Sequence, residues 1–95
     1  MNKLRLTEDQ VARIARALAE PRRVRILEQL GASQGATQCQ AVLDKQQPVT
    51  MATLSHHMKE LEAAGLIRME RKGKFKLLSL QREILGAYLE RLSDI

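Results

Sequence analysis

The sequence predicts a mainly α-helical fold with one small β-hairpin, and three features indicate it. Apolar residues recur at helical spacing over most of the chain. The period changes to that of extended strands between residues 66 and 80. The length of 95 residues is that of one small domain, so we expect a single domain over residues 1–95.

Two helices are expected in the N-terminal third. Thr7 and Gln10 have the spacing of a capping box, in which each side chain binds the other's backbone N–H, so a helix should begin there. Its apolar face continues to Leu18. Pro21 suits the first position of a second helix, where the missing N–H has no intrahelical partner. We expect that second helix to stop at Gly31.

The middle of the chain predicts a short helix and a longer one. Residues 37–45 form a weakly patterned third helix, and residues 46–49 form a turn. Thr50 is a candidate N-cap for a fourth helix that lasts to Ala64, with Gly65 at its end.

The fourth helix has two different faces. Steps of about 100° per residue place four side chains on a packed face: Met51, Leu54, Met58 and Leu61. The same steps place four others on a free face: Ala52, His56, Lys59 and Ala63. His57 lies at the flank of the packed face, where we expect a hydrogen bond from it to brace the helix.

The hairpin and a last helix complete the prediction. Gly73 supplies the positive φ of a tight turn. We expect residues 67, 69, 75 and 77 to face one side, and Arg68, Glu70 and Lys76 to face water. From Arg82 onward, helical spacing returns and predicts a fifth helix with Leu85, Leu89 and Leu92 on one face. Both aromatic side chains, Phe75 and Tyr88, are expected to pack in the interior.

The charge balance indicates a polyanionic partner. The chain has 16 Lys and Arg against 11 Asp and Glu, for a net charge of +5. Five of the basic residues lie between residues 68 and 76, beside Glu70 alone. Like charges on a hairpin repel, and phosphate is their natural counterpart. No apolar run is long enough for a membrane span or a signal peptide, so a soluble cytoplasmic protein is expected.

The order of these elements is that of a winged helix-turn-helix with about five helices and a two-stranded wing. Such a fold places the exposed face of its fourth helix in the major groove of double-stranded DNA and its basic hairpin on the neighbouring backbone. The expected DNA-contacting residues on the fourth helix are Thr50, Ala52, Thr53, Ser55, His56 and Lys59. On the wing they are Arg71, Lys72 and Lys74.

Three segments also resemble one family. Residues 17–27 (ALAEPRRVRIL) are similar to the opening of ArsR-type bacterial repressors. Residues 54–67 (LSHHMKELEAAGLI) resemble that family's recognition helix, and residues 71–74 (RKGK) its wing turn. The resemblance implies a homodimer, joined through the first and last helices near residues 7–19 and 82–93. It also implies a repressor that binds an inverted repeat and is released by a signal.

The sequence departs from the metal-sensing members of that family. Aligned on Leu43, Cys39 takes the place of the first cysteine of their pair and Ala41 that of the second. Soft metals need two or three thiolates. Residues 82–95 contain no histidine, which the family's other metal site uses. His56 and His57 point about 100° apart on a helix and cannot bind one ion together. We therefore predict no metal site, no cofactor and no metal response.

Several alternatives stay open. Cys39 is either a small buried apolar residue or a redox-reactive thiol that makes the repressor respond to oxidation. Arg22, Arg23 and Arg25 oppose the dipole of the second helix, so we expect them to serve a phosphate or an acidic partner, or Arg23 to form a structural ion pair. The chain has no glycine-rich phosphate loop or paired catalytic carboxylates, so an enzyme is not expected. A winged-helix adaptor that binds a protein is a second alternative. RNA binding is the third and weakest, because it typically uses exposed aromatic side chains and this chain has one Phe and one Tyr.

Overall fold

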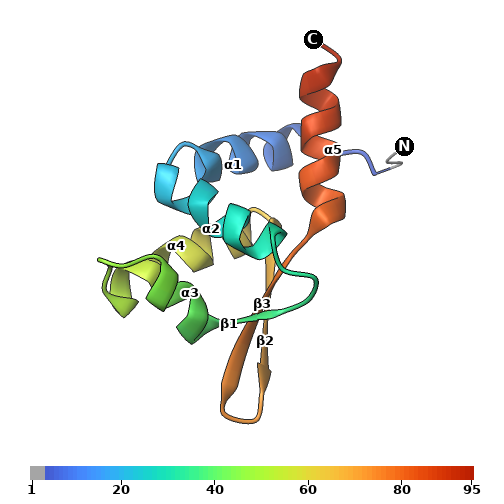
Figure 1. Cartoon of the computed structure of the whole chain (residues 1–95). Coiled ribbons are helices and arrows are strands. Elements are labelled where there is room, and N and C mark those ends of the chain that lie inside the picture. The colour runs from blue at the N-terminus through green and yellow to red at the C-terminus, as the bar shows by residue number, and fades with distance from the viewer. Residues whose placement is uncertain (1–3) are drawn as a thin grey trace.

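The computed structural model describes residues 4–95, and over that range the chain forms five helices and a three-stranded antiparallel sheet. The helices are α1 (Glu8–Leu18), α2 (Pro21–Gly31), α3 (Cys39–Lys45), α4 (Met51–Ala63) and α5 (Arg82–Ser93). The strands are β1 (Thr37–Gln38), β2 (Ile67–Lys72) and β3 (Phe75–Leu80). The hairpin of β2 and β3, residues 67–80, is the wing; it projects from the end of the molecule opposite α5 (Figure 1). None of the helices in residues 4–95 could cross a membrane.

The predicted start signals of the first two helices are confirmed. Thr7 Oγ1 accepts a hydrogen bond from the Gln10 backbone N–H at 3.1 Å, and Gln10 Oε1 accepts one from the Thr7 N–H at 2.7 Å. Pro21 is the first residue of α2. This helix includes Gly31, and Ala32 is its C-cap, one residue later than predicted.

The third predicted helix is shorter than expected, because its first two residues belong to the sheet. Thr37 pairs with Leu78 and Gln38 pairs with Leu77, and α3 begins only at Cys39. The sheet therefore has the order β1-β3-β2 and three strands, where the sequence predicted two. β1 supplies hydrogen-bond partners to an edge of β3 that would otherwise be open at this point.

The register of the wing corrects the predicted faces of β3. The two-residue turn pairs Lys72 with Phe75, and the same count pairs Met69 with Leu78. Cross-strand partners lie on the same face of a sheet. Leu78 is therefore on the buried face with Met69, and the prediction that Phe75 and Leu77 lie there is wrong. Phe75 is exposed, also contrary to prediction, whereas Tyr88 is buried as expected.

The core lies where α1, α2, α3 and α4 meet the sheet. Its largest fully buried side chains are Ile14, Ile26, Leu30, Val42, Leu54, Met58, Leu61, Leu66 and Leu78. The packed face predicted for α4 is right for three of its four residues and wrong for Met51, which is 42% exposed. Met51 lies about 60° from Leu54 around the helix, on the side away from Leu61 and His57. Met58 lies within about 20° of Met51 around the helix and is 1% exposed. Met51 is therefore exposed because it is the first residue of α4, beyond the end of the core.

Two glycines have positive φ, which the sequence predicted for Gly73; α4 ends at Ala63, one residue earlier than predicted. Gly65 follows the C-cap of α4 with φ of 78°, and Gly73 has φ of 61° at the tip of the wing. Positive φ is unfavourable for residues with a Cβ. The two glycines thus fix where α4 gives way to β2 and where β2 turns into β3.

Candidate nucleic-acid interface

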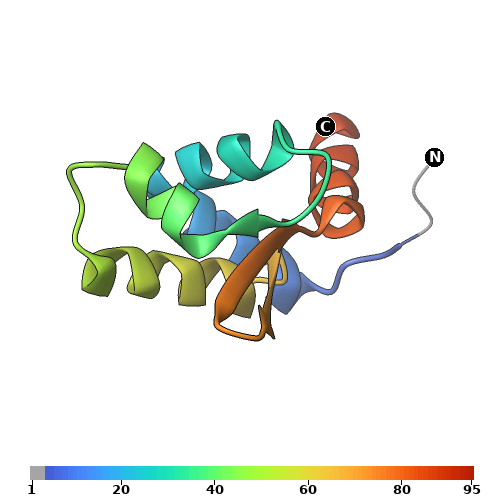
Figure 2. The ribbon, with the colours of Figure 1, turned by 60° about the horizontal axis from the view of Figure 1, so that its bottom comes forward.

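α4 presents its free face to solvent because its opposite face belongs to the core. Figure 2 shows α4 in a separate layer from α2 and α3, with the wing beside it. Leu54, Met58 and Leu61 fix the helix from within. The exposed side comprises Ala52, Thr53, His56 and Lys59, with Thr50 at the helix start. Ser55 is half-buried at the edge of that side.

The first turn of α4 is closed by its own threonines. Thr50 Oγ1 accepts a hydrogen bond from the Thr53 backbone N–H at 3.1 Å, as predicted for an N-cap, and lies 3.1 Å from Thr53 Oγ1. That turn, all of it described, has no acidic residue, whereas Glu60 and Glu62 are exposed near the other end of the helix. The N-terminal half of α4 is therefore the half that suits a polyanion.

His57 braces α4 against α2, as the sequence predicted. Its Nδ1 accepts a hydrogen bond from Arg23 Nε at 3.1 Å. Burial lowers the pKa of His57, and the positive charge of Arg23 lowers it further, which favours the neutral imidazole that can accept this bond. Arg23 thus has a neutral partner here, in place of the ion pair considered from the sequence. The neighbouring His56 is exposed, with its ring centroid 5.9 Å from that of His57.

Arg22 also acts within the fold. Its Nη1 donates to the Gln46 carbonyl oxygen at 2.6 Å, which ties the start of α2 to the end of α3. Its backbone N–H donates to the Glu20 carboxylate at 3.1 Å, and this side-chain cap offsets the absence of acidic residues in the first turn. Two of the three arginines expected to serve an acidic partner therefore have partners inside the chain.

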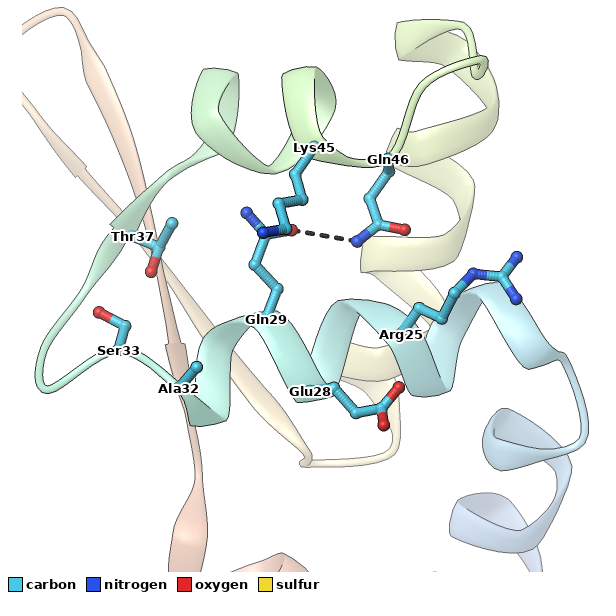
Figure 3. A pocket seen from close by; sticks show the side chains of 8 residues that line it. All are labelled: Arg25, Glu28, Gln29, Ala32, Ser33, Thr37, Lys45 and Gln46. Carbon is cyan, nitrogen blue, oxygen red and sulfur yellow. Dashed lines mark hydrogen bonds between the residues drawn. The ribbon is translucent and has the colours of Figure 1, made fainter.

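The third arginine, Arg25, lines an open depression of about 650 Å³ between α2 and α3 (Figure 3). Gln46 Nε2 donates to Gln29 Oε1 across it at 3.1 Å. The charged side chains around it are of both signs, Arg25 and Lys45 against Glu28. Its lining comes from α2, α3 and the segment between them, so the depression lies apart from the free face of α4 and the wing.

The wing exposes the basic side chains that the sequence singled out. Arg71, Lys72 and Lys74 are exposed, and Lys74 Nζ lies 5.6 Å from the centroid of the Phe75 ring. Arg71 stands directly opposite Lys76 across the hairpin, where like charges repel. The one carboxylate of the wing, Glu70, lies 3.7 Å from Arg68, nearer the core. The tip of the wing therefore stays strongly positive.

Three residues near the wing tip lie where the sequence did not place them. Met51 and Phe75 are exposed instead of packed, and Lys76 is half-buried instead of facing water. All three line one groove between α4, the start of α3 and the wing. Counting outward from the turn at Gly73 would have placed Phe75 correctly, because a two-residue turn fixes the register of both strands.

Cys39 is 8% exposed, and its Sγ lies 3.9 Å from the Met58 sulfur. Its position is that of a small apolar residue beneath α4. Within residues 4–95, no group of three or more His, Cys, Asp and Glu side chains could hold a metal ion.

A second exposed surface lies at α5. Leu89 is 53% exposed and Leu92 is 43% exposed, whereas Leu85 packs against the core. Arg91 Nη2 lies 2.8 Å from Glu8 Oε1, which ties α5 to the start of α1 beside these leucines. The first and last helices are thus joined by an ion pair, and the exposed leucines belong to α5.

The fold, with a helix exposed beside a cationic hairpin, defines a winged helix-turn-helix protein. A model of the helix-turn-helix domain family matches residues 18–70, more than half of the sequence. The chain belongs to that family, and the resemblance to ArsR-type regulators found in the sequence is confirmed. A search of curated proteins finds no significant match.

Solved structures show the same architecture. A crystal structure of an ArsR family transcriptional regulator is similar over 96% of this chain and 91% of that chain, with a TM-score of 0.80 at 23% identity. An ArsR-like regulator from Rhodococcus sp. RHA1 is similar over 90% and 78%, with a TM-score of 0.75 at 21% identity. The homodimeric winged helix-turn-helix DNA-binding domain of a possible ArsR-family regulator from Mycobacterium bovis is similar over 90% and 80%, with a TM-score of 0.73 at 27% identity.

Proposed function

We propose that this protein is a sequence-specific DNA-binding transcriptional regulator of the ArsR type. It is a single-domain, cytoplasmic repressor and not an enzyme, and it binds an inverted-repeat operator as a homodimer. One observation above all supports this: the exposed N-terminal half of α4 lies beside a wing whose tip has basic side chains without nearby carboxylates.

The two parts of this surface have different roles. Ala52, Thr53, His56 and Lys59 enter the major groove, and Thr50 and Ser55 stand at its edge. Threonine and alanine methyl groups suit the thymine methyl, whereas lysine suits guanine acceptors. Arg71, Lys72 and Lys74 bind phosphates of the neighbouring backbone, which adds affinity without choosing a sequence.

The homodimer forms through α1 and α5. Leu89 and Leu92 are too exposed for side chains of their size, and a second copy placed about a two-fold axis covers both patches at once. The two copies of α4 then enter successive major grooves about 34 Å apart. An operator with two inverted half-sites follows from this symmetry.

The regulator does not respond to metals in this proposal. The chain has one cysteine and no histidine beyond His57, so neither a thiolate pair nor a histidine in α5 is present to capture a soft metal. The inducing signal is of another kind. Cys39 is in contact with Met58 of α4, so oxidation of its sulfur would disturb the helix that contacts DNA.

The test is selection of fragmented genomic DNA by the purified protein at near-physiological salt, with and without reductant. We expect enrichment of a short inverted repeat. If an oxidant releases that DNA from the unmodified protein but not from Cys39→Ala, then Cys39 is a redox sensor. Retention without an enriched sequence, or no retention, contradicts the proposal and favours an adaptor that binds another protein.

A further inference from the structure

A groove of about 310 Å³ lies between the start of α3, the N-terminal half of α4 and the tip of the wing. Met51 and Ser55, one helical turn apart, form its wall on α4. They lie on the flank next to Ala52 and His56, which face outward. The groove therefore runs beside the proposed base-contacting face, on the side of the wing.

The groove combines positive charge with exposed apolar surface. Lys74 and Lys76 line it, and no carboxylate does so among the described residues. Phe75 is 46% exposed and Met51 42% exposed, and both border the same space. A free inorganic anion would use the lysines and leave these two side chains in water. The occupant that fits has anionic and apolar groups in alternation.

Neutral hydrogen-bonding groups complete the lining. Gln38 and Ser55 border the groove, and their side chains have no hydrogen-bond partner within residues 4–95. Gln40 differs, because its Nε2 donates to Asp44 Oδ1 at 2.9 Å and is thereby directed away from a ligand. The amide of Gln38 and the hydroxyl of Ser55 are donors of the kind that contact DNA phosphates.

The geometry of duplex DNA supplies such an occupant. One sugar–phosphate strand separates the major groove from the adjacent minor groove. If α4 enters the major groove and the wing reaches beyond it, that strand must pass between them. We propose that the groove holds this strand, with Met51 and Phe75 against deoxyriboses and with Lys74, Lys76, Ser55 and Gln38 at phosphates. The proposal rests on the proposed function and adds Met51, Phe75, Lys76 and Gln38 to the interface.

The first experiment measures binding to a random-sequence duplex over a range of salt concentrations. Met51→Ala and Phe75→Ala should each weaken binding about three- to tenfold without changing the salt slope, because apolar contacts release no counterions. Lys76→Ala should weaken binding and lower the slope by about one unit. Val24→Ala is the matched control, since it truncates an exposed apolar residue on α2, and it should bind as the unmodified protein does.

Protection of an introduced thiol tests occupancy directly. In a Cys39→Ala background, Gln38→Cys places a thiol in the groove and Gln34→Cys places one in the exposed loop after α2. Saturating duplex should slow maleimide labelling of the Gln38→Cys protein severalfold and leave that of the Gln34→Cys protein unchanged. Both variants alter exposed positions, so both should fold.

The outcomes separate the two proposals. If the unmodified protein binds duplex but Met51→Ala and Phe75→Ala bind equally well and the Gln38→Cys thiol stays reactive, the groove assignment is wrong and the regulator stands. Losses confined to the operator would make the two residues base contacts and overturn the assignment. Protection that grows with protein concentration, without DNA, would show a second copy in the groove and also overturn it. Failure to bind any duplex overturns both.

Discussion

The wing and α5 lie at opposite ends of the molecule (Figure 1), and they expose side chains of opposite character. The wing ends in Arg71, Lys72 and Lys74, whereas α5 exposes Leu89 and Leu92. Exposed ammonium and guanidinium groups are well hydrated, so the wing tip is stable in water without a bound polyanion. Exposed leucine surface costs about 25 cal/mol for each Å² that another surface could cover. We therefore expect the apolar surface of α5 to be covered permanently, and the wing to be covered only when DNA is bound.

This difference suggests a separate function for each end: dimerisation at α5 and DNA binding at the wing and α4. In the proposed homodimer, a two-fold pairing at α5 fixes the distance between the two copies of α4 and doubles every DNA contact. In the same proposal, the wing and α4 determine how strongly and where each copy binds. Changes at α5 should therefore act on both half-sites together, and changes at α4 or the wing on one contact at a time.

The largest effect is expected from Leu89→Glu, which places a carboxylate in the apolar surface of α5. The protein should become monomeric, and operator affinity should fall about a hundredfold or more, because the second half-site no longer adds to the first. Sedimentation velocity and operator titrations measure the two effects. Gln34→Glu adds the same charge in an exposed loop and serves as the control. A dimer that survives Leu89→Glu would place the interface elsewhere.

The next effect is expected at the free face of α4. His56→Ala or Lys59→Ala should weaken operator binding by about 1 to 3 kcal/mol and binding to random duplex much less, because base contacts exist only at the right sequence. Titrations of both duplexes at one salt concentration compare the two losses. Equal losses on operator and random DNA would remove these residues from base recognition.

A smaller and uniform effect is expected at the wing. Lys72→Ala or Lys74→Ala should weaken binding to all duplexes alike and lower the salt slope by about one unit each, because each lysine neutralises one phosphate. The slope of log affinity against log salt gives this number. Arg68→Ala is a matched control, since Arg68 lies near Glu70 and farther from the wing tip. A loss limited to the operator would contradict the division between wing and α4.

The helices could be predicted from the sequence because their signals are local. The hydroxyl oxygens of Thr7 and Thr50 cap helices by accepting hydrogen bonds from backbone N–H groups three residues away, and Gly65 ends α4 through its own backbone conformation. Apolar periodicity then predicts which face of α4 packs, except for Met51 at the margin. Such features depend on neighbours in the chain and need no knowledge of the rest of the fold.

What escaped prediction depends on partners far away in the chain. Thr37 and Gln38 become a strand only because β3 lies beside them, some forty positions later. A hydrogen bond at His57 was predicted, but its donor was not, because Arg23 lies 34 positions away in the chain. The groove shared by Met51 and Phe75 requires three elements at once. The exposed face of α4 could be predicted from the sequence because it is one face of one helix, but the groove beside it could not.

The smallest effect concerns the brace that holds α4 in place. Burial chiefly, and then the charge of Arg23, lowers the pKa of His57, while the carboxylate of Glu20 opposes them. Free histidine has a pKa of about 6.5, so below that pH the unfolded chain binds a proton that the folded chain resists. The stability due to neutral His57 is therefore fully present above about pH 6.5 and is lost as pH falls through the lowered pKa.

His57→Gln, whose amide oxygen can accept from Arg23 without titrating, should flatten the fall in unfolding free energy between about pH 7 and 5. Urea denaturation over this range measures the slope, with His56→Gln as the matched control at the exposed neighbour. An unchanged slope in His57→Gln would show that acid acts on this fold elsewhere than at the Arg23–His57 contact.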